Sequence, residues 1–166
     1  MARPTLELVR ALRVTAARLS SHESGGSYTW SHFGQCNCGN LAQTVTQLSP
    51  EEVYRAAFER AGDWGEQARE FCATSGYPID FVLQRLFELG VEQDDIRHLE
   101  RLSDDRVLKR LEVPWLAHNQ RDNVVLYMNA WADQLEEALP SVQSGLLAEA
   151  SDLPPWSWTD ERSAAE

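Results

Sequence analysis

The sequence lacks any long hydrophobic run, and no stretch approaches the roughly 20 apolar residues of a membrane-spanning helix. Near its start, Glu7 and Arg10 interrupt the apolar core that a signal peptide requires. Cysteine is scarce, because three cysteines in 166 residues do not make the disulfide framework of a secreted domain. We therefore expect a cytoplasmic protein without a membrane partner.

Lysine is almost absent too, since Lys109 is the single lysine among 15 basic residues. The 26 acidic residues bring the net charge to −11. Nucleic-acid binding requires a basic face for the phosphates, so this composition argues against a nucleic-acid partner. The partners that we expect are another protein or a second copy of the chain, and the kind of any small-molecule ligand stays open.

No window alternates apolar and polar residues as a strand does, and no repeat of fixed period occurs. Apolar residues instead recur at steps of three and four, as on one face of a helix. We predict an all-α, single-domain bundle of six to eight mostly short helices, with a loop-rich cysteine segment after the first. The helical domain covers residues 1–140, and residues 141–166 form a partly ordered extension with an acidic tail.

Three local patterns sharpen this prediction. Pro4 suits the first position of a helix that runs to Leu19, and Ser49 with Pro50 suits the start of another. The segment 80–89 is apolar around most of its circumference, which predicts a helix at the centre of the bundle. The helix predicted from Arg121 to Leu139 ends in acidic residues, so we expect fraying or a basic neighbour there.

Motifs that would name a reaction are missing. The sequence has no nucleophile elbow, phosphate loop, His-Glu-x-x-His pair or dinucleotide fingerprint. Whether the chain is an enzyme, and on what substrate, stays open at this stage.

The most concentrated chemistry lies between Tyr28 and Thr46. Cys36 and Cys38 form a Cys-x-Cys pair at a predicted helix start, where helix N–H groups lower a thiol pKa. With His32 and the distant Cys72 they would make a tetrahedral Cys3His set that suits zinc or another transition metal. The same thiols suit a redox site with a strained disulfide, and free cysteines are also common as small buried hydrophobes. Three further residues of the segment are candidates for binding: Trp30, Phe33 and Gly39.

Two alternatives use other residues. Asp94 with His98, and His118 with Asp122, stand four residues apart and could hold a metal in a helical enzyme, although ion pairs on a helix surface explain them too. Otherwise, the chain is an acidic, non-enzymatic interaction module with structural cysteines. Its tryptophans would then fill the core at positions 30, 64 and 131, and clamp the tail or present an aromatic surface at positions 115, 156 and 158.

The pattern Trp-x-His-x3-Cys-x-Cys-Gly-x-Leu-Ala-Gln, from Trp30 to Gln43, resembles a motif in a family of uncharacterised bacterial proteins. The similarity extends through Trp64 to the segment His98–Asp104. In that family a histidine can stand at the position of Asn40, so this chain lacks one candidate ligand. The resemblance implies no activity.

Overall fold

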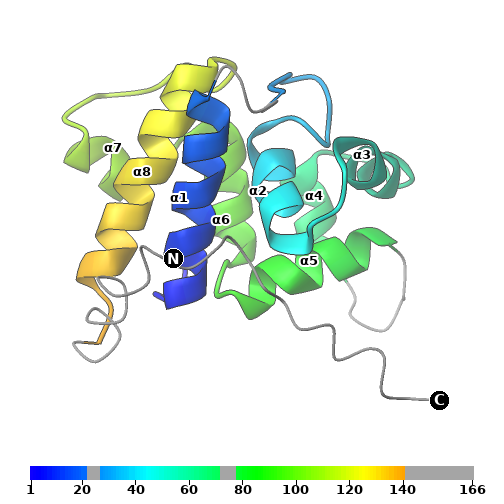
Figure 1. Ribbon diagram of the computed structural model, residues 1–166, viewed down its shortest axis with the longest axis horizontal. Helices are drawn as coiled ribbons and strands as arrows, with labels where there is room; N and C mark the ends of the chain where they lie inside the picture. Colours follow the sequence, from blue (N-terminus) through cyan, green and yellow to red (C-terminus); the bar gives the residue numbers. More distant parts are fainter. Residues whose placement is uncertain (22–26, 72–77, 141–166) are drawn as a thin grey trace.

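The computed structural model describes residues 1–21, 27–71 and 78–140, and these residues form eight α-helices and no β-strand (Figure 1). The predicted all-α single-domain bundle is therefore confirmed. None of the described helices is long and apolar enough to cross a membrane. In chain order the helices are α1 (Leu6–Ser20), α2 (Asn37–Thr46), α3 (Pro50–Phe58), α4 (Trp64–Arg69), α5 (Pro78–Glu88), α6 (Gln93–Arg101), α7 (Asp105–Arg110) and α8 (Arg121–Glu137).

Side chains at the helix starts explain where several helices begin. The Thr5 hydroxyl accepts a hydrogen bond from the Leu8 amide, so α1 starts after Thr5 and Pro4 lies outside it, contrary to the sequence-based prediction. At α3 the prediction is confirmed, because Ser49 and Glu52 form a reciprocal capping box and Pro50 is the first helical residue.

The longest helices, α1 and α8, lie side by side (Figure 1) and form the most extensive helix–helix contact among the described residues. Arg13 of α1 bonds to Glu136 of α8 and, at 2.9 Å, to Asp133. Glu137 pairs with Arg110 of α7 at 2.6 Å. The acidic end of α8 thus has the basic neighbours that its unfavourable position in the helix dipole predicted.

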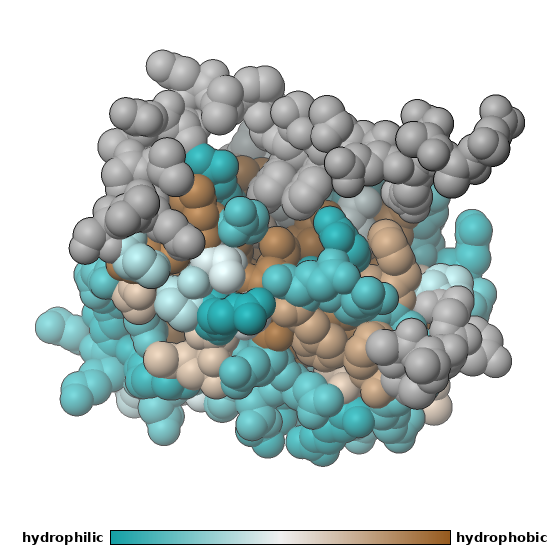
Figure 2. All heavy atoms as spheres, turned by 90° about the horizontal axis from the view of Figure 1, so that it is seen from below, coloured by the Kyte–Doolittle hydropathy of each residue, from teal (hydrophilic) through white to brown (hydrophobic). Residues whose placement is uncertain are grey.

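The hub of the bundle is α2, which packs against α1, α3, α5 and α6 and buries eight of its ten residues. The predicted central helix α5 instead lies at the lower edge in Figure 1, against α2 and α3. Its Phe81 is 41% exposed. Seen from that side, hydrophobic side chains gather in the middle of the face, with hydrophilic ones around them (Figure 2). The prediction that α5 lies at the centre of the bundle is therefore wrong. A broad apolar arc predicts that much of a helix surface is buried, but it does not predict how many other helices pack against it.

Candidate functional site

The cysteine segment is a compact turn fixed by its own backbone. The amides of Gln35 and Cys36 both donate to the His32 carbonyl at 2.8 Å, and Cys36 then caps α2. A Cβ at Gly39 would lie 2.0 Å from the Phe33 carbonyl oxygen. Glycine at this position therefore lets the turn cross the first residues of α2 in direct contact.

Both sulfur atoms of this turn are buried. Cys36 is 5% exposed and its thiol donates to the Phe33 carbonyl at 3.4 Å. Cys38 is 1% exposed and donates to the Ile96 carbonyl of α6, also at 3.4 Å. Each thiol thus serves as a weak donor that satisfies a carbonyl oxygen in the core.

The protonation of these thiols follows from their burial. Loss of solvent raises the pKa of Cys36 to about 11, while the Gly39 amide lowers it and the Glu100 carboxylate raises it. Burial, with Glu100 next, raises the pKa of Cys38 well above its ordinary value. The expected lowering by the helix start is therefore outweighed, and both thiols are neutral at pH 7.

Asn37 ties the start of α2 to two other parts of the chain. Its amide nitrogen donates to the Leu99 and Glu100 carbonyls of α6 at 3.0 and 2.9 Å, and its oxygen accepts from the Tyr28 hydroxyl at 2.9 Å. Asn37 is completely buried. The Asn40 side-chain amide donates to the Gln35 carbonyl at 2.6 Å and closes the turn.

Glu100 is the functional candidate that the sequence reasoning missed. Its carboxylate accepts hydrogen bonds from the amides of Trp64 and Gly65, at 2.8 and 3.1 Å, in the first turn of α4. Burial, reinforced by the nearby Asp63 carboxylate, raises its pKa to about 7. One signal was available: Glu100 stands four residues after Ile96, so it shares the apolar face of α6.

His32 points its ring at α3 and stacks on Tyr54, with centroids 4.1 Å apart and planes 28° apart. Tyr54 stacks in turn on Phe58, at 5.3 Å and 16°. We call His32, Tyr54 and Phe58 the aromatic ladder. It leads from the cysteine turn to the surface, where Phe58 is 64% exposed.

The predicted metal ligands do not all fall within the described residues. Cys72 lies outside them, so the complete Cys3His set cannot be assembled from this structure. Within residues 1–21, 27–71 and 78–140, no group of three or more His, Cys, Asp or Glu side chains could hold a metal ion. The zinc or redox site at Cys36, Cys38, His32 and Cys72 therefore stays a prediction.

The Asp/His pairs are not brought together into such a group either. His98 bonds to the Ser103 hydroxyl at 3.0 Å, while Asp94 pairs with Arg97 at 3.1 Å. In the second pair, His118 packs on Trp30, with ring centroids 4.4 Å apart, and Asp122 is exposed. These contacts match ion pairs and surface packing rather than a shared ligand set.

Four of the six tryptophans lie within the described residues. Trp64 and Trp131 are buried in the core, and Trp30 is partly buried against it. Trp115 is 69% exposed, whereas Trp156 and Trp158 lie outside the described residues, so tail clamping stays a prediction. The candidate binding residues Trp30 and Phe33 take part in packing: Phe33 accepts a hydrogen bond from the Trp64 indole at 3.2 Å.

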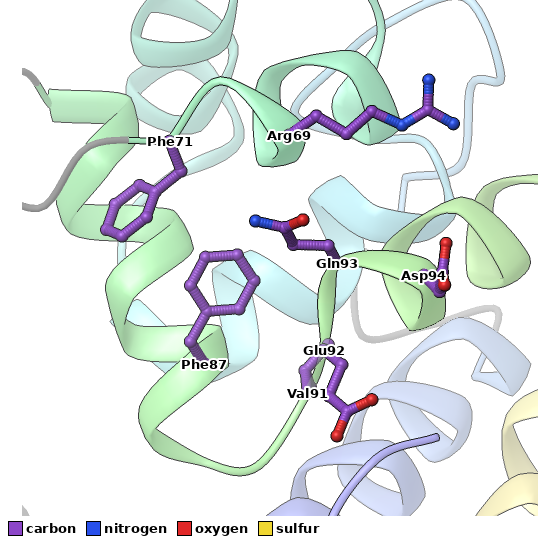
Figure 3. A pocket seen from close by; sticks show the side chains of 7 residues that line it. All are labelled: Arg69, Phe71, Phe87, Val91, Glu92, Gln93 and Asp94. Atoms are coloured by element: carbon purple, nitrogen blue, oxygen red, sulfur yellow. The ribbon is translucent and has the colours of Figure 1, made fainter.

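A pocket of about 510 Å³ lies between α4, α5 and the start of α6. Phe71 and Phe87 form one wall, Arg69 and Asp94 lie opposite, and Gln93 points between them (Figure 3). Asp94 is paired with Arg97, and Glu92, which also lines the pocket, binds the chain's terminal amine at 2.7 Å. Cys36, Cys38 and Glu100, whose pKa values are strongly raised, do not line this pocket. The pocket is therefore separate from the cluster around Glu100.

The candidate site therefore has two parts, a buried polar cluster at Cys36, Cys38 and Glu100, and the aromatic ladder that connects it to the surface. Comparisons with protein-family models, with curated proteins and with solved structures give no match to this chain.

Proposed function

We propose that this chain is a non-enzymatic protein-interaction module of the cytoplasm, and that the aromatic ladder is its contact surface. The observation that carries this proposal is the exposure of Phe58 at the end of an ordered stack, 64% of it facing solvent. In this proposal the Cys-x-Cys helix is the structural hub behind the surface, because its thiols are buried and neutral.

An isolated exposed hydrophobic residue is common in proteins and would carry no conclusion. Phe58 differs because its ring stacks on Tyr54, which in turn stacks on His32, so one face of the ring is already supported before any partner binds. A pre-ordered side chain loses less conformational entropy on binding. Covering the ring of a phenylalanine contributes about 2 kcal/mol, and aromatic residues are enriched in interface cores.

The experiment places a photo-crosslinking amino acid at position 58 of the full chain in its native host. The matched control places it at position 81, because Phe81 is also exposed but lies on α5. We expect a discrete protein adduct from position 58 that is absent from position 81.

The captured partner is then purified and titrated with variants. Phe58→Ala should weaken its binding at least tenfold, since an interface anchor contributes more than about 1.4 kcal/mol, whereas Phe81→Ala should leave it unchanged. Identical adducts from both positions, no adduct, or equal affinity of Phe58→Ala and wild type would overturn the proposal.

A further inference from the structure

The pocket between α4, α5 and the start of α6 brings an apolar wall and two polar side chains to one hollow (Figure 3). Phe71 and Phe87 form the wall, with ring centroids 5.1 Å apart and ring planes at 76° to each other. Arg69 lies opposite the wall, and the amide of Gln93 points between them (Figure 3). A flat ring placed on the phenylalanine wall would therefore have the Arg69 side chain on its other side.

The polar residues of the lining differ in whether they have partners. The acids Glu92 and Asp94 are engaged with cations at 2.7 and 3.1 Å. Arg69 is exposed and forms no ion pair with another described residue, and the Gln93 side chain forms no hydrogen bond with one. A cation and an amide are therefore the polar groups that this pocket leaves available to an occupant.

These groups together fit an indole. A tryptophan ring is the best aromatic partner of a cation, and its large apolar surface suits a wall of two phenylalanine rings. Its ring N–H is a donor only, which the oxygen of the Gln93 amide can accept. An anionic ligand fits less well, because the carboxylates of Glu92 and Asp94 also line the pocket.

The last helix ends at the same end of the molecule as the pocket. Met1 connects the two: its amine binds Glu92 of the lining, and its sulfur lies 3.8 Å from Nε2 of Gln134 in the last turn of α8. α8 ends at Glu137, and the described part of the chain ends at Pro140. The residues that follow therefore leave the bundle on the side of the pocket.

The sequence beyond Pro140 supplies an occupant of this kind. Residues 153–159, outside the described part, read Leu-Pro-Pro-Trp-Ser-Trp-Thr and carry two tryptophans and no charge. Pro154 follows Pro140 by 14 residues, a length that spans roughly 20 Å when flexible and at most about 48 Å when extended. A segment tethered in this way has an effective concentration in the millimolar range, so a modest affinity keeps it bound.

We propose that this pocket is the docking site of the chain's own segment 153–159, with the indole of Trp156 or Trp158 held between the phenylalanine wall and Arg69. The segment itself carries no charge, so the acids of the lining do not repel it. This contact is separate from the aromatic ladder and does not rest on the proposed function. It fastens the C-terminal segment to α4, α5 and α6.

The test uses fluorine NMR on the full chain labelled with fluorotryptophan. Trp156→Phe and Trp158→Phe assign the two signals of the tail, and a labelled peptide of residues 150–166 gives their positions in the undocked state. We expect one tail signal to be displaced from its position in the peptide by the rings of the wall. A soluble gadolinium reagent should broaden this signal less than it broadens the signal of the peptide.

Three variants connect that displacement to the pocket. Phe87→Leu removes a ring of the wall and Arg69→Gln removes the cation, so each should lower the docking equilibrium constant about three- to tenfold and move the signal toward its position in the peptide. Phe81→Leu is the matched control, because Phe81 is also exposed on α5 but does not line the pocket. It should leave the signal unchanged.

The signals of Trp64 and Trp131, which are buried in the core, report whether each variant keeps the fold. If Phe87→Leu shifts them, the exposed Arg69→Gln decides the question. Tail signals that coincide with those of the peptide would overturn the inference and leave the pocket to a separate ligand. So would a displacement that survives in both pocket variants. A displacement that changes when the protein is diluted would show that another copy supplies the indole, and would overturn it too.

Discussion

At the scale of single residues, burial decides the chemistry of the cysteine turn. A thiol reacts as its thiolate, and burial raises the pKa of Cys36 to about 11 and that of Cys38 well above its ordinary value. In a Cys72→Ser variant, where only these two thiols remain, we expect no reaction with Ellman's reagent in the native state. Both should react fully after unfolding in guanidinium chloride.

The same preparation tests the metal prediction. Full-length protein with all three cysteines is analysed for bound zinc and other transition metals, alongside the Cys72→Ser variant. Stoichiometric metal lost from the variant, or rapid labelling of the native thiols, would contradict a purely structural role for Cys36 and Cys38.

His32 and Cys36 stand four residues apart, and a hydrogen bond from the Cys36 amide to the His32 carbonyl joins them in one turn of backbone, a relation that is local in the sequence. Sequence spacing could not show that the His32 ring stacks on Tyr54, since this depends on how α3 returns over the turn. Glu100 was missed for a similar reason. Its two amide partners belong to α4, and only the packing of α4 on α6 brings them to its carboxylate.

At the scale of helices, the crossing of the cysteine turn over α2 depends on Gly39. A methyl group there would be 2.0 Å from a backbone oxygen of Phe33, so the turn or the helix must move. We expect Gly39→Ala to lower the free energy of unfolding by roughly 2–4 kcal/mol, measured by urea denaturation.

Gly65→Ala is the matched control, because its Cβ would approach the end of the Glu100 side chain at 3.2 Å rather than backbone. This contact is tight but does not overlap as the one at Gly39 does, and alanine favours the helix, so the loss should be smaller than for Gly39→Ala. Equal stabilities of wild type and Gly39→Ala would show that the close crossing is not required.

Helix positions were predictable where a local signal determines them. The helix start at Ser49 and Pro50 is determined by neighbouring residues and is confirmed. At the acidic end of α8 the expectation was fraying or a basic neighbour, and the structure shows basic neighbours, Arg13 and Arg110, from two other helices. The choice of hub was not predictable in this way. α2 is central because four helices, α1, α3, α5 and α6, pack against it, whereas α5 leaves Phe81 at the surface.

At the scale of the whole molecule, Glu100 couples α6 to α4, so its ionisation contributes to the stability of the entire fold. Glu100 is 6% exposed. Its pKa is raised from 4.5 to about 7 in the folded chain, first by burial and then by Asp63. Folding therefore favours the protonated carboxyl group over the carboxylate.

The sign of the pH dependence follows from this shift. The contribution of Glu100 is fully present below pH 4.5, falls as pH rises toward about 7, and is constant above that value. The total loss is of order 3 kcal/mol, since each pKa unit corresponds to about 1.4 kcal/mol. Urea unfolding of wild type and Glu100→Gln between pH 4.5 and 8 measures it. Subtracting the free energy of unfolding of Glu100→Gln from that of the wild type cancels the titration of other groups. We expect this difference to become less favourable to the wild type as pH rises. A difference that stays constant would show that Glu100 ionises in the fold as it does in water.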